Sequence, residues 1–348
     1  MSRKSGFDAR GLDAKGFDAW ADAIRTGSRR DLARGITLVE SNRIEDVEPA
    51  QELLERLIPF SGSADRIGIS GMPGAGKSTF IEMLGRILAE DGHKVAVLAV
   101  DPSSPVSGGS ILGDKTRMTD LSRMEQVFVR PSPAGRTPGG VARKTREAML
   151  LCEAAGYDTV LVETVGAGQS EWRVSSMTDL FIVLMLPNAG DVLQGIKRGI
   201  LEMSDIILVN KADGTRREAA AEAAEQYRNA LQITDGDGSG TTVRTCSALD
   251  RASVNECRRV ASEMLSTRKE DSSFDEKRRT QLRQWIRSLA EDSLLQLLED
   301  DRGFPGMLDE LEREISEGKT TPLRAGLSLR NRIIREIGRW NSKSGLPL

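Results

Sequence analysis

Histidine and cysteine are scarce in this sequence, and their scarcity argues against metal and redox chemistry of the usual kinds. Among 348 residues there is one histidine, His93, and there are three cysteines, Cys152, Cys246 and Cys257. The cysteines have neither the spacing of metal ligands nor that of a redox pair, and one histidine cannot build a usual zinc cluster. We therefore expect a reducing cytoplasm as the simplest location.

Long apolar runs and a basic charge excess are also missing. No stretch approaches the roughly 18 apolar residues that span a bilayer, and the N-terminus has no apolar signal core. The acidic residues Asp8, Asp13 and Asp18 argue against an organelle transit peptide. A formal net charge of -3 gives no overall basic field to attract nucleic acid or an anionic membrane. We expect a cytoplasmic protein without a nucleic-acid or membrane partner.

A glycine-rich loop is the strongest motif that the sequence does contain. It stands between an apolar run with strand character and an apolar-periodic segment that predicts a helix. The glycines let consecutive backbone N–H groups curl around phosphate oxygens, and the helix N-terminus adds its positive end. Lys77 is expected to reach the β- and γ-phosphates, and the Ser78 hydroxyl to hold Mg2+. The predicted phosphate cradle consists of Gly71, Met72, Pro73, Gly74, Ala75, Gly76, Lys77, Ser78 and Thr79.

Strands and helices alternate from Arg66 onward. Seven strands are expected, at Arg66–Ser70, Lys94–Val100, Val127–Arg130, Thr159–Glu163, Leu180–Leu186, Ile206–Asn210 and Thr242–Thr245. Helices are expected between most of them, at 78–90, 138–155, 191–203 and 215–231. Several strands are continuous Val/Ile/Leu runs, which is typical of strands covered on both faces. The pattern predicts an α/β fold of the P-loop NTPase type, with a mostly parallel sheet flanked by helices and with helical N- and C-terminal extensions.

The composition and the change of pattern along the chain suggest three parts. With 39% hydrophobic and 29% charged residues, the chain is an ordinary globular protein. We expect an N-terminal tail and helices over 1–60, a P-loop nucleotide-binding domain over 61–267 and a helical dimerisation segment over 268–348. The Gly-Phe-Asp-Ala near-repeat in residues 6–20 predicts a mobile tail, because glycine recurs in it. The C-terminal helices either pack on their own domain or form a subunit interface.

Carboxylates follow two predicted strands, where ligands of parallel sheets bind. Asp101 ends one strand, and Glu163 ends another with Gly166 three residues later. A carboxylate beside a phosphate loop suits Mg2+ or its water shell, and the glycine N–H can contact the γ-phosphate. Asp114, in a glycine-rich loop, is a further candidate for the metal or for a switch contact.

A second strong motif, Asn210-Lys211-Ala212-Asp213, follows a continuous apolar strand. The acceptor-only carboxylate of Asp213 suits the N1–H and exocyclic amine of guanine, a pair of donors that adenine lacks. Lys211 can lie along the base, and Asn210 can tie neighbouring loops together. At the next strand end, the segment with Ser247, Ala248 and Leu249 can offer a backbone N–H to the guanine O6. The sequence therefore predicts a site for GTP and GDP with Mg2+.

These residues resemble the MeaB/ArgK/MMAA group of P-loop GTPases, which are chaperones of adenosylcobalamin-dependent acyl-CoA mutases. Beyond the nucleotide motifs, long and more specific segments carry the resemblance, at 101–104, 108–118, 139–148, 163–171 and 193–197. The resemblance implies GTP hydrolysis that gates delivery of adenosylcobalamin to a mutase such as methylmalonyl-CoA mutase, and protection of that mutase. It also implies a homodimer joined through the helical extensions.

The resemblance further implies roles for individual residues. It places Asp101 and Glu163 near Mg2+ and Asp114 in a switch loop, and it makes Pro187 to Lys197 another switch, whose Lys197 approaches the nucleotide when the mutase docks. The catalytic set is then Lys77, Lys197, Glu163 and Asp114, and the metal set Ser78, Asp101, Asp114 and Glu163. The chain departs from the family where Asn188 replaces a usual glycine and where the stretch after Leu249 lacks the usual glycines.

Three other functions compete with this interpretation. A metal-insertion GTPase shares the same core but needs Cys and His ligands that the sequence lacks. A kinase of a small molecule or a transport protein is disfavoured by Asp213 and by the absence of a substrate-base motif. A non-hydrolysing scaffold is disfavoured by the complete phosphate and metal set. The sequence leaves open which mutase is served.

Overall fold

The structure is a computed structural model that describes residues 9–100, 118–131, 138–164, 170–187, 198–235, 240–299 and 304–344. The backbone forms two compact units, Met1–Gln281 and Leu282–Leu348. The boundaries predicted after residues 60 and 267 remain a proposal.

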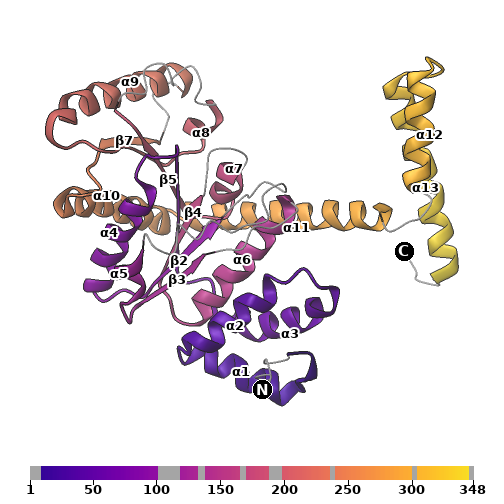
Figure 1. The fold of residues 1–348 in the computed structure, drawn as a ribbon, viewed down its shortest axis with the longest axis horizontal. Coiled ribbons are helices and arrows are strands. Elements are labelled where there is room, and N and C mark those ends of the chain that lie inside the picture. The colour runs from indigo at the N-terminus through magenta and orange to yellow at the C-terminus, as the bar shows by residue number, and fades with distance from the viewer. Residues whose placement is uncertain are drawn as a thin grey trace, which may run out of the picture. The chain divides into compact units, whose positions relative to one another are not determined.

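The first unit is built on a seven-stranded parallel sheet (Figure 1). The strands are β1 (Asp65–Gly71), β2 (Val95–Val100), β3 (Val127–Pro131), β4 (Thr159–Thr164), β5 (Leu180–Met185), β6 (Ile206–Val209) and β7 (Thr242–Thr245). Their order across the sheet is β3-β2-β4-β1-β5-β6-β7, so β1 is central. All seven predicted strands are present, which confirms the predicted fold class.

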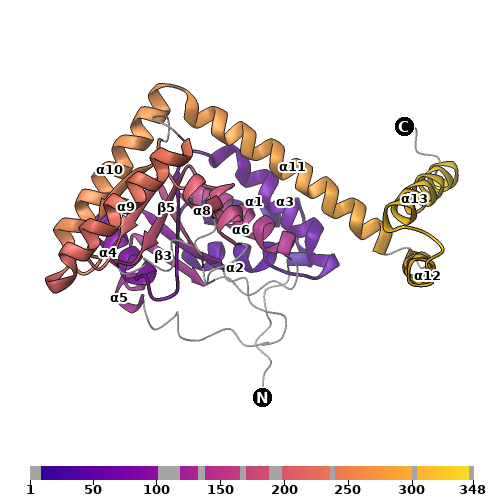
Figure 2. The ribbon, with the colours of Figure 1, turned by 90° about the horizontal axis from the view of Figure 1, so that it is seen from above.

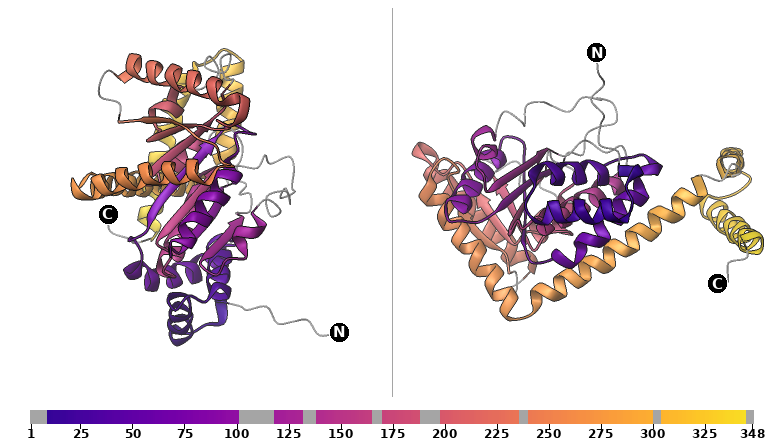
Figure 3. Two further views of the ribbon diagram at one scale, coloured as in Figure 1. Left: turned by 90° about the vertical axis from the view of Figure 1, so that its left-hand side faces the viewer. Right: turned by 90° about the horizontal axis from the view of Figure 1, so that it is seen from below.

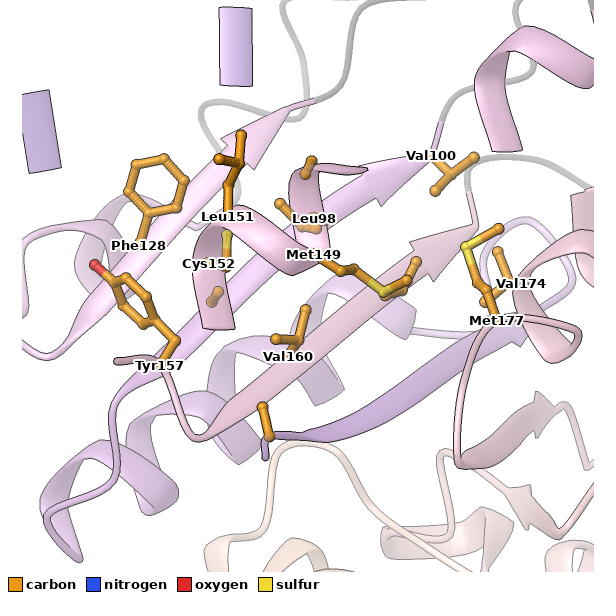
Figure 4. Packing of buried hydrophobic residues seen from close by; sticks show 14 of the residues in the cluster. Leu98, Val100, Phe128, Met149, Leu151, Cys152, Tyr157, Val160, Val174 and Met177 are labelled. Carbon is orange, nitrogen blue, oxygen red and sulfur yellow. The ribbon is translucent and has the colours of Figure 1, made fainter. Parts of the chain in front are cut away.

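Apolar side chains on both faces of the sheet explain why the strands are continuous Val/Ile/Leu runs. In β4, Val160 and Val162 belong to one buried cluster, whereas Leu161 belongs to the other. Because successive strand residues point to opposite faces, a strand buried on both sides must be apolar throughout. Figure 4 shows the first cluster, in which Val160 lies near Met149 and Leu98.

Ten helices of the described part of the first unit surround this sheet or continue from it. They are α1 (Ala14–Arg25), α2 (Arg29–Val39), α3 (Val47–Leu57), α4 (Lys77–Glu90), α5 (Thr119–Ser122), α6 (Pro138–Ala154), α7 (Ser170–Ser175), α8 (Arg198–Glu202), α9 (Arg217–Asp235) and α10 (Arg251–Glu270). Residues from α4, α5 and α10 join one buried cluster, and residues from α6, α7 and α9 join the other. Figure 2 shows α10 beside α4. Helix α11 (Ser273–Glu299) begins in this unit and runs into the next.

The N-terminal helices α1 to α3 pack on α6 (Figure 3), and this corrects the prediction of a mobile tail. The tail was predicted over 6–20, but α1 begins at Ala14, with Phe17 and Trp20 buried. The Asp13 carboxylate caps the helix by accepting from the Gly16 N–H at 2.9 Å. The cap and the buried aromatic face outweigh the low helix propensity of glycine. Residues 6–8 lie outside the described residues.

Two other helices differ from the predictions. Helix α10 was not predicted, and it begins where the Asp250 carboxylate accepts from the Ala252 N–H at 3.0 Å. The helix predicted at 191–203 is described only from Arg198, because 188–197 lie outside the described residues.

An ionic cluster, in which one aspartate is buried and the other members are partly buried, lies at the edge of the sheet where β5 and β6 begin. We call it the anchor, and it consists of Asp179, Asp205, Arg268, Lys277 and Arg278. Arg278 donates to both carboxylate oxygens of Asp179, at 2.8 and 2.7 Å, and Lys277 donates to Asp205 at 3.3 Å. Arg268 pairs with Asp205 and donates to the Asp179 carbonyl at 2.8 Å. The anchor fastens the end of α10 and the start of α11 to the sheet.

The backbone also takes part in the anchor. The Asp179 carboxylate accepts from the Arg66 N–H at 2.8 Å, and the Asp205 carboxylate accepts from the Phe181 N–H at 2.7 Å. Burial lowers the pKa of Lys277, although Asp205 acts against this shift. Each carboxylate therefore satisfies both a strand N–H and a cationic side chain.

We expect Asp179→Ala to lower the free energy of unfolding by about 3–5 kcal/mol, the usual cost of removing one partner of a buried ion pair. Asp179 is 1% exposed, so its loss removes the carboxylate that pairs with Arg278 and the acceptor of the Arg66 N–H. Urea unfolding followed by circular dichroism measures the change. The control is Asp120→Ala, since Asp120 is 67% exposed and 3.9 Å from Arg86, and it should cost less than about 1 kcal/mol. Equal costs would show that the anchor contributes no more than a surface pair.

The second unit contains the rest of α11 together with α12 (Phe304–Ser316) and α13 (Pro322–Ser344). Arg332 and Glu310, 2.6 Å apart, link α13 to α12. Large apolar side chains of this unit remain exposed, namely Leu282, Ile286, Leu294, Leu308, Leu323, Leu327 and Ile334. No helix among the described residues is both long enough and apolar enough to span a membrane.

Candidate functional site

The glycine-rich loop lies between the carboxyl end of β1 and the first turn of α4. Gly71, Gly74 and Gly76 have φ angles of +145°, +78° and +91°, in the region that favours glycine. A Cβ on Gly71 would lie 2.3 Å from the Leu184 carbonyl oxygen, and one on Gly76 would lie 2.5 Å from the Asn210 amide nitrogen. Glycine is therefore needed at both positions for the loop to pass so close to β5 and to the segment after β6.

Lys77, the first residue of α4, folds back over this loop. Its Nζ donates to the Gly71 carbonyl at 2.8 Å and to the Met72 carbonyl at 3.3 Å, and the residue is 9% exposed. The ammonium and the positive N-terminus of α4 both lie at the loop. The ammonium, the helix N-terminus and the backbone of the loop together suit the binding of phosphate.

Two oxygen-bearing side chains, those of Ser78 and Glu163, meet beside the loop. The Ser78 hydroxyl donates to the Glu163 carboxylate at 3.0 Å, and Glu163 is 4% exposed at the end of β4. In the neighbouring strand, Ser70 accepts a hydrogen bond from the Thr164 hydroxyl at 2.9 Å, so side chains tie β1 to β4. Carboxylate and hydroxyl oxygens are the ligand type that Mg2+ takes, and Ser78 and Glu163 therefore fit such an ion. The other predicted residues, Asp101, Asp114, Gly166 and Lys197, lie outside the described residues.

Asn210, 1% exposed at the end of β6, connects the phosphate loop to the loop after β7. Its amide nitrogen donates to the Ala75 carbonyl at 2.6 Å, and its amide oxygen accepts from the Ala248 N–H at 2.9 Å. This confirms the predicted tie between loops. The Ala248 N–H is therefore already paired with Asn210. The Ser247 N–H is paired as well, because it donates to the Ser253 hydroxyl at 2.9 Å. Of the segment predicted to meet guanine O6, the Leu249 N–H is the one without a described acceptor.

Two side chains hold the Asp213 carboxylate. One oxygen accepts from the Arg216 guanidinium at 2.6 Å, and the other accepts from the Ser247 hydroxyl at 2.9 Å. The hydrogen bond from Arg216, followed by that from Ser247, holds the pKa of this carboxyl below its usual value. Lys211 next to it has a φ of +60°, an uncommon conformation for a non-glycine residue.

Sequence reasoning missed two of these contacts. Arg216 was not singled out, although it stands three residues after Asp213, within reach in a turn. Ser247 was predicted to act through its backbone, whereas its hydroxyl contacts Asp213. Other predicted neighbours are brought together as expected, because β1, β4, β6 and β7 all end at the same edge of a parallel sheet.

Three features define a P-loop GTPase. They are the phosphate loop after the central strand β1, the acidic residue at the end of the neighbouring strand β4, and the Asn-Lys-X-Asp turn after β6 on the other side of β1. The family model described as "Methylmalonyl Co-A mutase-associated GTPase MeaB" matches residues 32–302. The chain belongs to this family, and it is a guanine-nucleotide-binding GTPase, as the sequence predicted.

Relatives in bacteria and animals support this assignment. The chain is 46% identical over 307 residues to "Probable GTPase Rv1496" of Mycobacterium tuberculosis, covering 88% of this chain and 91% of that protein. It is 45% identical over 283 residues to "GTPase ArgK" of Escherichia coli, covering 81% and 86%. It is 41% identical over 311 residues to "Methylmalonic aciduria type A homolog, mitochondrial" of Mus musculus, covering 86% and 75%.

A solved structure shares the fold. The crystal structure described as "LAO/AO transport system kinase" superposes with a TM-score of 0.76 at 34% identity, covering 92% of this chain and 99% of that chain.

Proposed function

We propose that this GTPase gates the delivery of adenosylcobalamin to an acyl-CoA mutase, such as methylmalonyl-CoA mutase, and protects that mutase. The observation that carries the proposal is the match of a mutase-associated GTPase family over residues 32–302, which includes the phosphate loop, the Glu163 strand end and Asp213. The similar mouse protein is named for methylmalonic aciduria, a name that refers to the same acyl group. The reducing cytoplasm remains the proposed location, since all three cysteines are free thiols.

In this proposal the phosphate loop, residues 71–79, cradles the triphosphate. Lys77 gives up its hydrogen bonds to the loop carbonyls and binds the β- and γ-phosphate oxygens instead. The dipole of α4 adds positive charge at its N-terminus. Ser78 and Glu163, with Asp101 and Asp114, hold Mg2+, which supplies positive charge to the phosphates. Gly166 contacts the γ-phosphate. At the other end, Asp213 accepts from the guanine N1–H and 2-amino groups, while Lys211 lies along the base.

Catalysis in this proposal is completed by a partner. Lys197 lies in the proposed switch loop after β5 and approaches the γ-phosphate when the mutase docks. A cation at the developing charge of the transition state can accelerate phosphoryl transfer strongly. Hydrolysis by the chain alone is then slow, and the mutase raises the rate.

Substituting Lys197 by alanine tests this division of labour. We expect mutase-stimulated GTP hydrolysis to fall by about tenfold or more, while the basal rate stays nearly unchanged. Phosphate release measured with and without methylmalonyl-CoA mutase, loaded with adenosylcobalamin or as the apoprotein, gives both rates. Lys94→Ala removes an exposed lysine elsewhere as a control. Equal losses of basal and stimulated activity would contradict the proposal for Lys197, and no stimulation of the wild-type chain would contradict the mutase as partner.

We also propose a homodimer joined through the C-terminal helices. The exposed leucine and isoleucine side chains of α11, α12 and α13 support it, because so much apolar surface on paired helices is typically covered by a partner. Sedimentation equilibrium of the full chain measures the mass directly. A monomer at micromolar concentration would refute this part of the proposal.

The alternative function is that of a kinase, because the similar crystal structure is described as a transport system kinase. The two activities differ in the acceptor of the γ-phosphate, which is water for a GTPase and a substrate hydroxyl or side chain for a kinase. Labelled γ-phosphate is expected to appear as inorganic phosphate. Metal insertion has less support, since it needs Cys and His ligands and the sequence has one histidine and no cysteines with metal-ligand spacing.

A further inference from the structure

Arg216 is the residue of the proposed base site to which no role has yet been given. It lies in the turn before α9, three residues after Asp213, and its backbone N–H donates to the Asp213 carbonyl at 3.0 Å. The same turn brings its guanidinium to 2.6 Å from the Asp213 carboxylate. The backbone of the motif therefore directs this side chain to the one carboxylate that is proposed to recognise the base.

The arrangement leaves the carboxylate free to accept two further hydrogen bonds. A carboxylate has two oxygens with about four acceptor positions in all. Arg216 uses one position on one oxygen, and Ser247 uses one on the other. Each oxygen keeps an acceptor position, and the guanine edge presents two adjacent donors, N1–H and the 2-amino group. The two protein donors can thus hold the carboxylate from one side while the base is bound from the other.

We propose that Arg216 is a positioning residue for guanine recognition, which together with Ser247 fixes the orientation of the Asp213 carboxylate toward the base. The proposal rests on the proposed guanine site and names a residue through which that site gains its selectivity. Arg216 acts through Asp213 and needs no contact with the nucleotide.

The charges around Asp213 support this role. Arg216 is the main reason that the pKa of the Asp213 carboxyl lies below its usual value, and Lys211 acts in the same direction from the motif itself. A protonated carboxyl would present a donor to the guanine N1–H and would lose the recognition. An aspartate is already ionised at neutral pH, so the main contribution of Arg216 is the orientation of the carboxylate.

The expected effect is moderate because the pair is partly exposed, with 49% of the Arg216 side chain and 33% of the Asp213 side chain accessible. Exposed ion pairs typically change an equilibrium by about two- to fivefold. We therefore expect Arg216→Ala to weaken GDP binding by about two- to fivefold rather than to abolish it. Arg216→Lys, which keeps the charge, should restore part of the affinity.

Arg217 provides a matched control. It is the next residue, it is also exposed, and it has no described contact with Asp213. Arg217→Ala removes one positive charge from the adjacent residue, so it controls for the loss of a charge in this part of the chain. GDP affinity of the Arg217→Ala chain should equal that of the wild type.

A double-mutant cycle separates an effect through Asp213 from general damage to the turn. In Asp213→Asn the carboxylate is replaced by a neutral amide, which can donate to the 2-oxo group of xanthine, so xanthosine diphosphate serves as the ligand. Arg216→Ala should cost clearly less affinity in that background, because the ion pair is gone and a neutral amide oxygen accepts only a weaker hydrogen bond from Arg216. Isothermal titration calorimetry of the full chain with GDP or xanthosine diphosphate gives all the dissociation constants.

Three results would overturn the inference. The first is equal GDP affinity of Arg216→Ala and Arg217→Ala, and the second is tighter GDP binding by Arg216→Ala. The third is that Arg216→Ala lowers xanthosine diphosphate affinity in the Asp213→Asn background as much as it lowers GDP affinity in the wild type. If the wild-type chain binds no GDP, the guanine site itself fails, and the role of Arg216 fails with it. Normal GDP binding by the wild type with no effect of Arg216→Ala refutes Arg216 alone.

Discussion

Replacing Lys77 by methionine is expected to lower kcat/KM for GTP hydrolysis by about 10²–10³, the usual cost of losing one preorganised group at a developing negative charge. Methionine keeps an unbranched side chain of similar length, so the packing at the start of α4 is retained. The ammonium is lost, and with it the charge that the loop carbonyls of Gly71 and Met72 hold over the phosphate cradle. Phosphate release at saturating and subsaturating GTP measures the effect.

Lys94→Met is the matched control for this variant. Lys94 is exposed and directly precedes β2, whose amino end lies at the opposite edge of the sheet from the phosphate loop. Its hydrolysis rate should equal that of the wild type. Thermal unfolding of both variants checks that the fold is intact. A Lys77→Met chain that is folded and hydrolyses GTP normally would disprove the assignment of the phosphate loop.

Asp213→Asn should change which purine the protein prefers. An amide and a carboxylate have nearly the same shape, but the amide presents a donor where guanine also presents donors. Leaving such groups unpaired is costly, and sites built to hydrogen-bond a ligand reject mismatched analogues by large factors. We expect GDP affinity to fall by about a hundredfold or more and xanthosine diphosphate affinity to rise, as measured by calorimetry.

The second purine makes this result specific to the base. Loss of binding to both nucleotides would indicate a damaged site, whereas exchange of the preference identifies Asp213 as the group that contacts the base. Asp271→Asn, at an exposed aspartate between α10 and α11, is the control and should bind GDP as the wild type does. Unchanged preference in Asp213→Asn would show that the base is recognised elsewhere.

The sheet and the outline of the site could be predicted from the sequence because their signals are local. Continuous apolar runs such as those of β4 and β5 leave little alternative to buried parallel strands. The phosphate loop and the Asn-Lys-X-Asp turn each stand directly after such a run. Parallel strands place their carboxyl ends at one edge, so the nearness of Ser78 to Glu163 follows from strand order.

Other features depend on contacts that a linear pattern does not reveal. Glycine at position 16 suggested a loose tail, but the Asp13 cap and the burial of Phe17 and Trp20 produce a helix. The Ser247 and Ala248 N–H groups donate to the side chains of Ser253 and Asn210, and the linear pattern does not reveal these contacts. Arg216 resembles any surface arginine until the turn is seen to place it on Asp213.

The anchor, at the start of β5 and β6, has a practical consequence for anyone who shortens this protein. A fragment ending at residue 267 would lack Arg268, Lys277 and Arg278, and would leave the Asp179 and Asp205 carboxylates without these cationic partners. A fragment ending after Gln281 would keep all three, as well as the hydrogen bond from the Gln281 amide to the Thr178 carbonyl at 2.8 Å. The nucleotide-hydrolysing unit should therefore be expressed with the first turns of α11 still attached.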